Sequence, residues 1–226
     1  NDEHTKKIFE QERLIKEGNN LVEQGHYTEG IVKYNEAMNP DLLLHDYDIA
    51  RPVLLTADAL KFNGQYEDAL NQVKRLKECP EMPSGQLPSP SCYEKLELEA
   101  LIKARDTNST QSIYDYISYL EKKYKKILPP QMCVGWCDAV FATIARLYDH
   151  IGDYDEGIEF TDRFLQFYKK IGPGDPYQPA NPHFQVKQAF LQEKTEGGTG
   201  CVAAKPGEAC MGRATKALIQ SDYFPW

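Results

Sequence analysis

One short pattern occurs three times along this chain, and it limits the possible folds more than any other feature of the sequence. The pattern is Gly-x-Tyr-x-x-small-aliphatic, and it starts at Gly25, Gly64 and Gly152. A small residue lies seven positions before each of these glycines, and a bulky residue lies four positions before it. Glycine ends a helix readily because it adopts the left-handed conformation without a steric penalty. The pattern therefore predicts three pairs of antiparallel helices, each joined by a tight turn at the glycine.

These positions resemble those of the tetratricopeptide repeat. The resemblance covers residues 14–40, 53–80 and 141–168. It implies that the tyrosine packs across the turn and that the small residues let the two helices of a pair approach closely. It also implies an all-α fold, in which antiparallel helix hairpins stack into a right-handed superhelix.

The spacing of the three glycines indicates a fourth, degenerate unit. Gly64 follows Gly25 by 39 residues and Gly152 follows Gly64 by 88, which is two steps of 44. Both steps exceed the usual repeat length of about 34 residues, so the loops between units must be long. Helical patterns over 93–105 and 111–126 fill the interval. We therefore expect a repeat domain over residues 1–170, with units at about 11–40, 46–79, 93–127 and 133–169.

The resemblance ends near Tyr168, and residues 171–226 form a separate C-terminal extension. A stretch rich in glycine and proline over 172–179 predicts a loop. Helices are expected over 181–193 and 208–220. A terminal helix usually covers the last apolar face of a solenoid, so we expect this extension to cap the array.

The composition excludes two classes of partner. The chain has 226 residues and a formal net charge of −8, with 41% hydrophobic residues. An acidic balance argues against nucleic acid and against an anionic membrane surface, because both require a basic face. No apolar run approaches the roughly 18 residues of a membrane-spanning helix. We therefore expect a soluble protein whose partner is another protein or an extended peptide, bound either alone or as part of a larger complex.

Six cysteines occur, and each is a candidate for a disulfide. They lie in three neighbouring pairs: Cys79 and Cys92, Cys133 and Cys137, and Cys201 and Cys210. The first and last pairs bracket irregular loops, where a disulfide stabilises most because the loop has no hydrogen-bonded ladder of its own. Six cysteines allow 15 connectivities, so neighbour pairing is one arrangement among several.

The cysteines also favour an oxidising compartment. The chain begins at Asn1 without an initiator methionine or an apolar leader, as after removal of a signal peptide or in a fragment. We expect a secreted, periplasmic or organelle-lumenal protein. Asn108, in the sequence Asn-Ser-Thr, is a candidate glycosylation site within an expected turn.

Catalytic chemistry has little support in the sequence. The five histidines form no paired-ligand spacing, and the nucleophile, Walker and dinucleotide-binding motifs do not occur. The glycine-rich run over 197–200 lacks the strand and the Lys-Ser/Thr of a phosphate-binding loop. Cys133 and Cys137 could hold one side of a zinc ion, but no fourth ligand is evident, which favours a structural disulfide. We predict a protein that is not an enzyme and has no cofactor and no metal.

The resemblance implies that the first helix of each unit lines a concave face that binds a peptide or a partner helix. Carried over position by position, the partner-binding residues would be Glu12, Ile15, Asn19 and Val22 in the first unit, Arg51, Leu54, Asp58 and Lys61 in the second, and Ala139, Ala142, Arg146 and Asp149 in the last.

Two narrower resemblances lead to different conclusions. The subclass that grips chaperone C-termini uses a Lys/Arg/Asn clamp, which only Asn19 matches; Ile15 and Leu55 stand where a lysine and an asparagine are required. The stretch from Cys133 to Cys137 and residues 164–168 resemble the helical domains of collagen prolyl 3-hydroxylases and cartilage-associated protein over about 40 residues. The iron-binding catalytic domain of those enzymes has no counterpart here.

Three functions remain open at this point. The first is a binding module or scaffold that holds a partner protein. The second is a structural subunit of a larger assembly, whose repeats serve as packing surface. The third is a domain that presents a peptide substrate to a catalytic partner.

Overall fold

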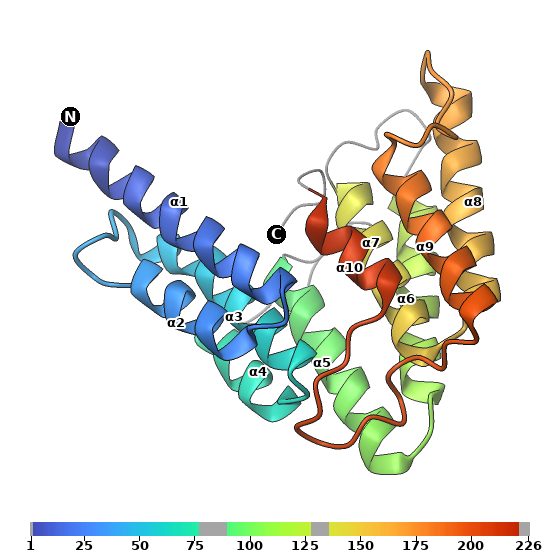
Figure 1. Cartoon of the computed structure of the whole chain (residues 1–226), viewed down its shortest axis with the longest axis horizontal. Coiled ribbons are helices and arrows are strands. Elements are labelled where there is room, and N and C mark those ends of the chain that lie inside the picture. The colour runs from blue at the N-terminus through green and yellow to red at the C-terminus, as the bar shows by residue number, and fades with distance from the viewer. Residues whose placement is uncertain (1, 77–89, 128–135, 222–226) are drawn as a thin grey trace.

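The computed structural model describes residues 2–76, 90–127 and 136–221, and within these ranges the chain is all-helical, without strands. This confirms the all-α class. Figure 1 shows two groups of helices that diverge from α5 (Pro90–Thr107). One group holds α1 to α4 and the other holds α6 to α9, while α10 lies in the space between them.

Eight of the helices form four consecutive hairpins. The pairs are α1 (Asp2–Glu23) with α2 (Tyr27–Ala37), α3 (Ala50–Phe62) with α4 (Tyr66–Val73), α5 with α6 (Gln111–Ile127), and α7 (Trp136–Ile151) with α8 (Tyr154–Ile171). A short 3₁₀ helix, Asp46–Ile49, precedes α3. The two helices of each pair pack against each other, and each hairpin also contacts the next.

The four turns share one hydrogen-bonded geometry. Gly25, Gly64 and Gly152 have φ values of 83°, 74° and 72°, and Asn108 takes the same place in the third hairpin with φ 49°. In every turn the following residue donates its N–H to the carbonyl five positions back, as in the Schellman motif. These bonds are His26 to Leu21, Gln65 to Leu60, Ser109 to Ala104 and Asp153 to Tyr148. The two helices of the degenerate third unit are therefore joined by the same type of turn as those of the other three.

Small residues bring the helices of a hairpin together, as the sequence predicts. A Cβ atom on Gly18 of α1 would lie 2.5 Å from the ring of Tyr34 on α2, and one on Gly30 would lie 2.6 Å from Val22. These contacts pair residue 18 with 34 and residue 22 with 30, which is the register of antiparallel helices. The approach is so close that a larger residue at either position would displace Tyr34 or Val22.

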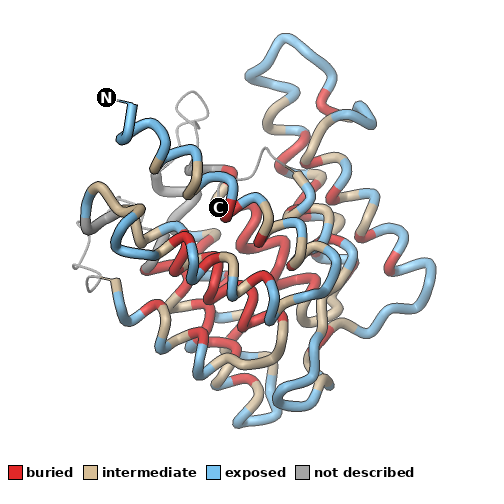
Figure 2. The backbone as a smooth tube through the Cα atoms, turned by 60° about the vertical axis from the view of Figure 1, so that its left-hand side comes forward, coloured by how far each residue is buried: buried red, intermediate tan, exposed pale blue. Residues whose placement is uncertain are grey.

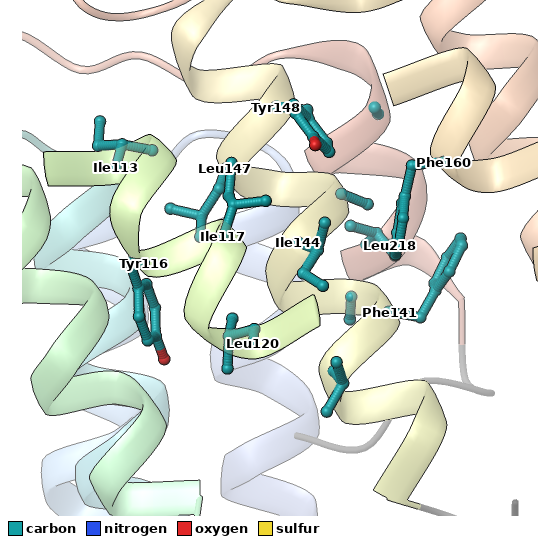
Figure 3. Close-up of a cluster of buried hydrophobic side chains, with 14 of the residues drawn as sticks. Ile113, Tyr116, Ile117, Leu120, Phe141, Ile144, Leu147, Tyr148, Phe160 and Leu218 are labelled. Atoms are coloured by element: carbon teal, nitrogen blue, oxygen red, sulfur yellow. The ribbon is translucent and has the colours of Figure 1, made fainter. Parts of the chain in front are cut away.

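Buried residues gather on the inner sides of the helices (Figure 2). The largest cluster joins α5, α6, α7, α8 and the C-terminal helices; Figure 3 shows Ile113, Ile144 and Phe160 within it. A second cluster joins α1, α2 and α3 and includes Leu14, Ile15 and Phe62. The first and last hairpins therefore have separate cores.

The C-terminal extension does more than cover the end of the array. Helix α9 (Pro182–Glu196) packs on α8, where Phe190 fills the space beside Gly157. The loop after α9 then runs back across two repeat turns: Cys201 donates its N–H to the carbonyl of His150, and Cys210 donates to that of Phe62. Helix α10 (Arg213–Gln220) contacts α7, α9 and α1. It thus lies between the two groups of helices rather than at an end.

The disulfide between Cys201 and Cys210 confirms one expected pair, with an S–S distance of 2.01 Å. Cys92 is also disulfide-bonded, and no described cysteine is free. Cys79 and Cys133 lie outside the described residues, as does the side chain of Cys137. The pairing of these three cysteines stays a prediction.

Candidate binding groove

A groove of about 360 Å³ opens between α3, α5 and α7, the first helices of the second, third and fourth hairpins. This volume lies within the range of about 300–1,000 Å³ that is usual for ligand-binding pockets. We call it the binding groove. It is lined by Ala50, Arg51, Leu54, Leu55, Asp58, Tyr93, Glu94, Ala139, Thr143 and Arg146.

The walls of the binding groove are mostly apolar. Leu54 and Leu55 come from α3, and Ala139 comes from α7. Tyr93 of α5 adds an aromatic ring that is 5% exposed. The Thr143 hydroxyl donates to the carbonyl of Ala139 at 2.9 Å, so it is satisfied within its own helix. A polypeptide side chain entering here would therefore meet apolar surface on several sides.

Charged side chains form the floor. Five of them make a continuous network, which we call the ionic network: Asp58, Lys61, Glu94, Glu97 and Arg146. The Lys61 ammonium donates to Asp58 Oδ1 at 2.7 Å and to Glu94 Oε1 at 2.8 Å. The Arg146 guanidinium donates to Glu97 at 2.9 Å. All five residues are buried, with exposed fractions of 2–8%.

Burial and the neighbouring charges shift the pKa values of two carboxyl groups in this network in opposite directions. Desolvation and the neighbouring Asp58 carboxylate raise the pKa of Glu94 well above its usual range. Burial acts on Asp58 in the same direction, but the charges of Lys61 and Arg146 outweigh it and lower the pKa of that carboxyl. These opposite directions favour the neutral form of Glu94 and the ionised form of Asp58.

The rim of the groove carries an exposed ion pair. The Arg51 guanidinium of α3 lies 2.8 Å from Glu12 of α1, and both side chains are about half exposed. Exposed pairs of this kind contribute little to stability, roughly 0–1 kcal/mol, because water screens them. The pair nevertheless neutralises the charge of Arg51 beside the opening.

Helix α10 occupies the neighbouring part of the same inner face. Asp149 of α7 accepts hydrogen bonds from the N–H of Thr215 at 2.9 Å and from its hydroxyl at 2.6 Å. Glu193 of α9 accepts from the N–H of Arg213 at 2.7 Å. Two carboxyl groups thus hold the first turn of α10, where unpaired N–H groups and the helix dipole favour negative charge.

The structure brings six of the predicted concave-face residues to the binding groove or its rim. Arg51, Leu54, Asp58 and Arg146 line it, together with Ala139. Glu12 lies on the rim through its pair with Arg51. Lys61 lies behind the lining, within the ionic network.

The other predicted positions lie elsewhere. Ile15 and Ala142 are buried in the two core clusters, at 2% and 0% exposure. Val22 and Asn19 line a small cavity of about 50 Å³ beside Ile219 of α10, and Asn19 also accepts a hydrogen bond from Tyr34. Asp149 binds α10, as described above. These residues bind other parts of the chain itself.

Sequence reasoning missed the contribution of α5. Tyr93 and Glu94 line the groove, and Glu97 completes the ionic network. The third unit lacks the Gly-x-Tyr pattern, so no register could be carried over to its first helix. The Asn-Ser turn at Asn108 was the available signal, since asparagine is the commonest substitute for glycine in the left-handed conformation.

Asn108 itself is exposed in the turn between α5 and α6. Its positive φ gives it a structural role in ending α5, apart from any modification. Glycosylation at this position stays a prediction.

No group of three or more His, Cys, Asp or Glu side chains forms a potential metal site within the described residues. In the same part of the chain, none of the helices combines the length and apolar character needed to cross a bilayer. Comparisons of the chain with family models, with curated proteins and with solved structures find no match.

Proposed function

We propose that this chain is a non-enzymatic protein-binding module that holds a segment of another polypeptide in the binding groove. The observation that carries this proposal is the groove itself, about 360 Å³ in volume, with apolar walls and a charged floor. Few, well-placed polar groups within a mostly apolar lining are typical of sites that bind with specificity. Its walls come from three successive first helices, which are the helices that bind partners in helical repeat proteins.

The proposed architecture behind this function is a right-handed solenoid of the tetratricopeptide type. Four hairpins with one shared turn geometry support it. The bonded cysteines support an extracytoplasmic compartment, because disulfides persist in oxidising surroundings.

A structural role within a larger assembly is the second candidate. Phe9 and Ile8 of α1 are exposed to 69% and 44%, and large apolar side chains on one short stretch favour a packing surface. This surface lies on α1, outside the lining of the binding groove. The two functions can therefore be tested separately.

A peptide library tests the binding proposal. Displayed random peptides of about twelve residues are selected on the full chain, and the enriched peptides are then titrated against two variants. Leu54→Arg places a long charged side chain at the groove wall, and we expect it to weaken binding about tenfold or more, equivalent to about 1.4 kcal/mol.

Val32→Arg makes the same change at an exposed position of α2 and serves as the control, with binding expected to stay at the wild-type level. The proposal fails when no peptide is enriched, or when Leu54→Arg binds the enriched peptides as tightly as the wild type.

A further inference from the structure

We propose that the occupant of the binding groove contributes a cationic side chain, lysine or arginine, whose charge lies against Asp58 and Glu94. This inference rests on the proposed function and specifies the chemistry of its partner. It is carried by the charge balance of the ionic network and by the position of its acidic residues.

The ionic network contains one more acidic residue than basic residues. Three carboxyl groups face two cations, Lys61 and Arg146, and all five residues are buried. An uncompensated charge in a low-dielectric site costs several kcal/mol, so a buried network requires a balancing positive charge. Within the part of the chain that the structure describes, a proton on Glu94 can supply this charge when the groove is empty, because burial raises the pKa of that carboxyl. A cation from a partner supplies the same charge.

The excess negative charge lies at the groove. Asp58 and Glu94 line it, whereas Lys61 and Glu97 do not. Of the two arginines in the lining, Arg146 binds Glu97 and Arg51 binds Glu12. An anionic partner would find both arginines already engaged and would have to approach the two carboxyl groups. The charge distribution therefore favours a cationic partner.

The walls suit the same side chain. Leu54, Leu55 and Ala139 provide apolar surface for the methylene groups of a lysine or arginine, whose head can remain with the polar floor. Tyr93 adds an aromatic ring to the lining, and aromatic rings attract cations through their electron-rich faces. Apolar contact and charge recognition thus occur within one groove.

Binding of the cation exchanges it for the proton on Glu94. The neutral carboxyl loses its proton to solvent, and the resulting carboxylate pairs with the ammonium or guanidinium of the partner, so the net charge of the site is conserved. Other titratable and charged groups also face this carboxyl from the surrounding helices, namely Asp58 and Lys61 of α3, Glu97 of α5, Tyr116 of α6 and Arg146 of α7. Burial raises the pKa of Tyr116 well above its usual range, so its hydroxyl stays neutral.

Three capped tripeptides test the inference on the full chain. They are Ac-Leu-Lys-Leu-NH₂ and the same peptide with norleucine or glutamate in the centre. We expect the lysine peptide to bind about tenfold more tightly than the norleucine peptide, with amide shifts in α3, α5 and α7 by nuclear magnetic resonance. Calorimetry in two buffers of different ionisation enthalpy should show proton release on binding of the lysine peptide and none on binding of the norleucine peptide.

The variant Glu94→Gln removes the exchangeable proton and keeps the shape of the side chain. This variant should release no proton when the lysine peptide binds. It should bind the lysine peptide less than about threefold more tightly than the norleucine peptide, and the norleucine peptide should still bind. Glu99→Gln makes the same change on the exposed side of α5 and should behave as the wild type. Should Glu94→Gln not fold, the peptide series and the proton release of the wild type still decide the question.

The outcomes separate the two proposals. Equal binding of the lysine and norleucine peptides, or strongest binding of the glutamate peptide, overturns the cationic inference and leaves the binding function in place. Binding of none of the three peptides at millimolar concentration, together with an unproductive library selection, overturns both.

Discussion

At the scale of single residues, α10 begins at a close contact between Gly212 and Asp149. A Cβ atom on Gly212 would lie 2.2 Å from Oδ2 of Asp149. Gly212 has an ordinary φ of −75°, so backbone strain plays no part and the conflict is purely steric. We expect Gly212→Ala to lower the free energy of unfolding by about 1–3 kcal/mol, as for other overpacked sites, measured by urea denaturation.

Gly174 provides the matched control for this substitution. A Cβ atom there has no neighbour within 4 Å. Gly174→Ala should therefore leave the stability within about 0.5 kcal/mol of the wild type. Equal stability of the two alanine variants would show that α10 does not require the close approach of Gly212.

A second residue-scale prediction concerns the proton at Asp149. Burial and the adjacent Glu193 carboxyl raise the pKa of Asp149 well above its usual range, although its bonds to Thr215 oppose this. A raised pKa in the folded state gives stability that is complete below the unfolded pKa, about 4, and is lost as the pH rises through the folded pKa. Tyr154 also interacts with this carboxyl, and burial raises the pKa of its hydroxyl, which stays neutral.

Asp149→Asn should remove this part of the pH dependence. Asparagine can still accept from Thr215, and its amide can donate to the adjacent Glu193 carboxyl, but it does not titrate. We expect unfolding free energies of the wild type to fall relative to those of Asp149→Asn as the pH rises above about 4, by at most about 1.4 kcal/mol per pH unit. Asp115→Asn, at an exposed position of α6, is the control. Parallel pH profiles for wild type and Asp149→Asn would contradict the raised pKa of Asp149.

The residues of the groove show what a repeat pattern can and cannot predict. Arg51, Leu54 and Arg146 could be placed because a Gly-x-Tyr turn fixes the register of their helices. Ile15 and Ala142 occupy equivalent positions but are buried in the cores. Whether such a position faces a groove or a neighbouring helix depends on the angle between hairpins, which long-range packing sets. Glu94 could not be placed because its hairpin carries no glycine at the turn.

At the scale of helices and turns, the repeat glycines differ in what surrounds them. A Cβ on Gly25 has open space, whereas one on Gly64 would lie 2.8 Å from the carbonyl oxygen of Glu208 in the loop before α10. Both residues have positive φ, so a change to alanine at either position should lower the free energy of unfolding by about 1–2 kcal/mol. We expect Gly64→Ala to be the more destabilising by a further 1 kcal/mol or so, because the docked loop must also shift.

The loop itself supplies the control. Replacing Cys201 and Cys210 with serine frees the loop, and the difference between Gly25→Ala and Gly64→Ala should then shrink in urea denaturation. Loss of a disulfide that closes a loop of about ten residues should itself cost about 2–3 kcal/mol. A difference that persists unchanged in the serine background would place its cause outside the docked loop.

Helix boundaries and turns followed from local signals, whereas the path of the C-terminal extension did not. Each hairpin turn depends on residues within a few positions, so Gly25, Gly64 and Gly152 could be read directly. The bonds from Cys201 to His150 and from Cys210 to Phe62 join residues far apart in the chain. No local pattern encodes them, and a helix expected over 208–220 could have packed on either side of the array.

At the scale of the whole molecule, α10 contacts two of the hydrophobic cores that the described residues form. Leu218 is buried in the cluster formed with α6, α7 and α8. Ile219, the next residue, packs against the cluster of α1, α2 and α3. Adjacent residues on one short helix thus contact both groups of helices seen in Figure 1. Because α10 contacts both groups, we expect it to influence the distance between them as well as the stability of the fold.

Ile219→Asp should loosen the connection between the two groups while Leu218 keeps α10 on the last hairpin. Spin labels at exposed positions 36 of α2 and 159 of α8 report the distance between the groups by pulsed electron resonance. We expect a broader distance distribution for Ile219→Asp, because an ionised carboxylate cannot remain against an apolar cluster. Lys216→Asp introduces the same side chain on the exposed face of α10 and should leave the distribution unchanged. Identical distributions for both variants would mean that α3, α4 and α5 alone fix the arrangement of the two groups.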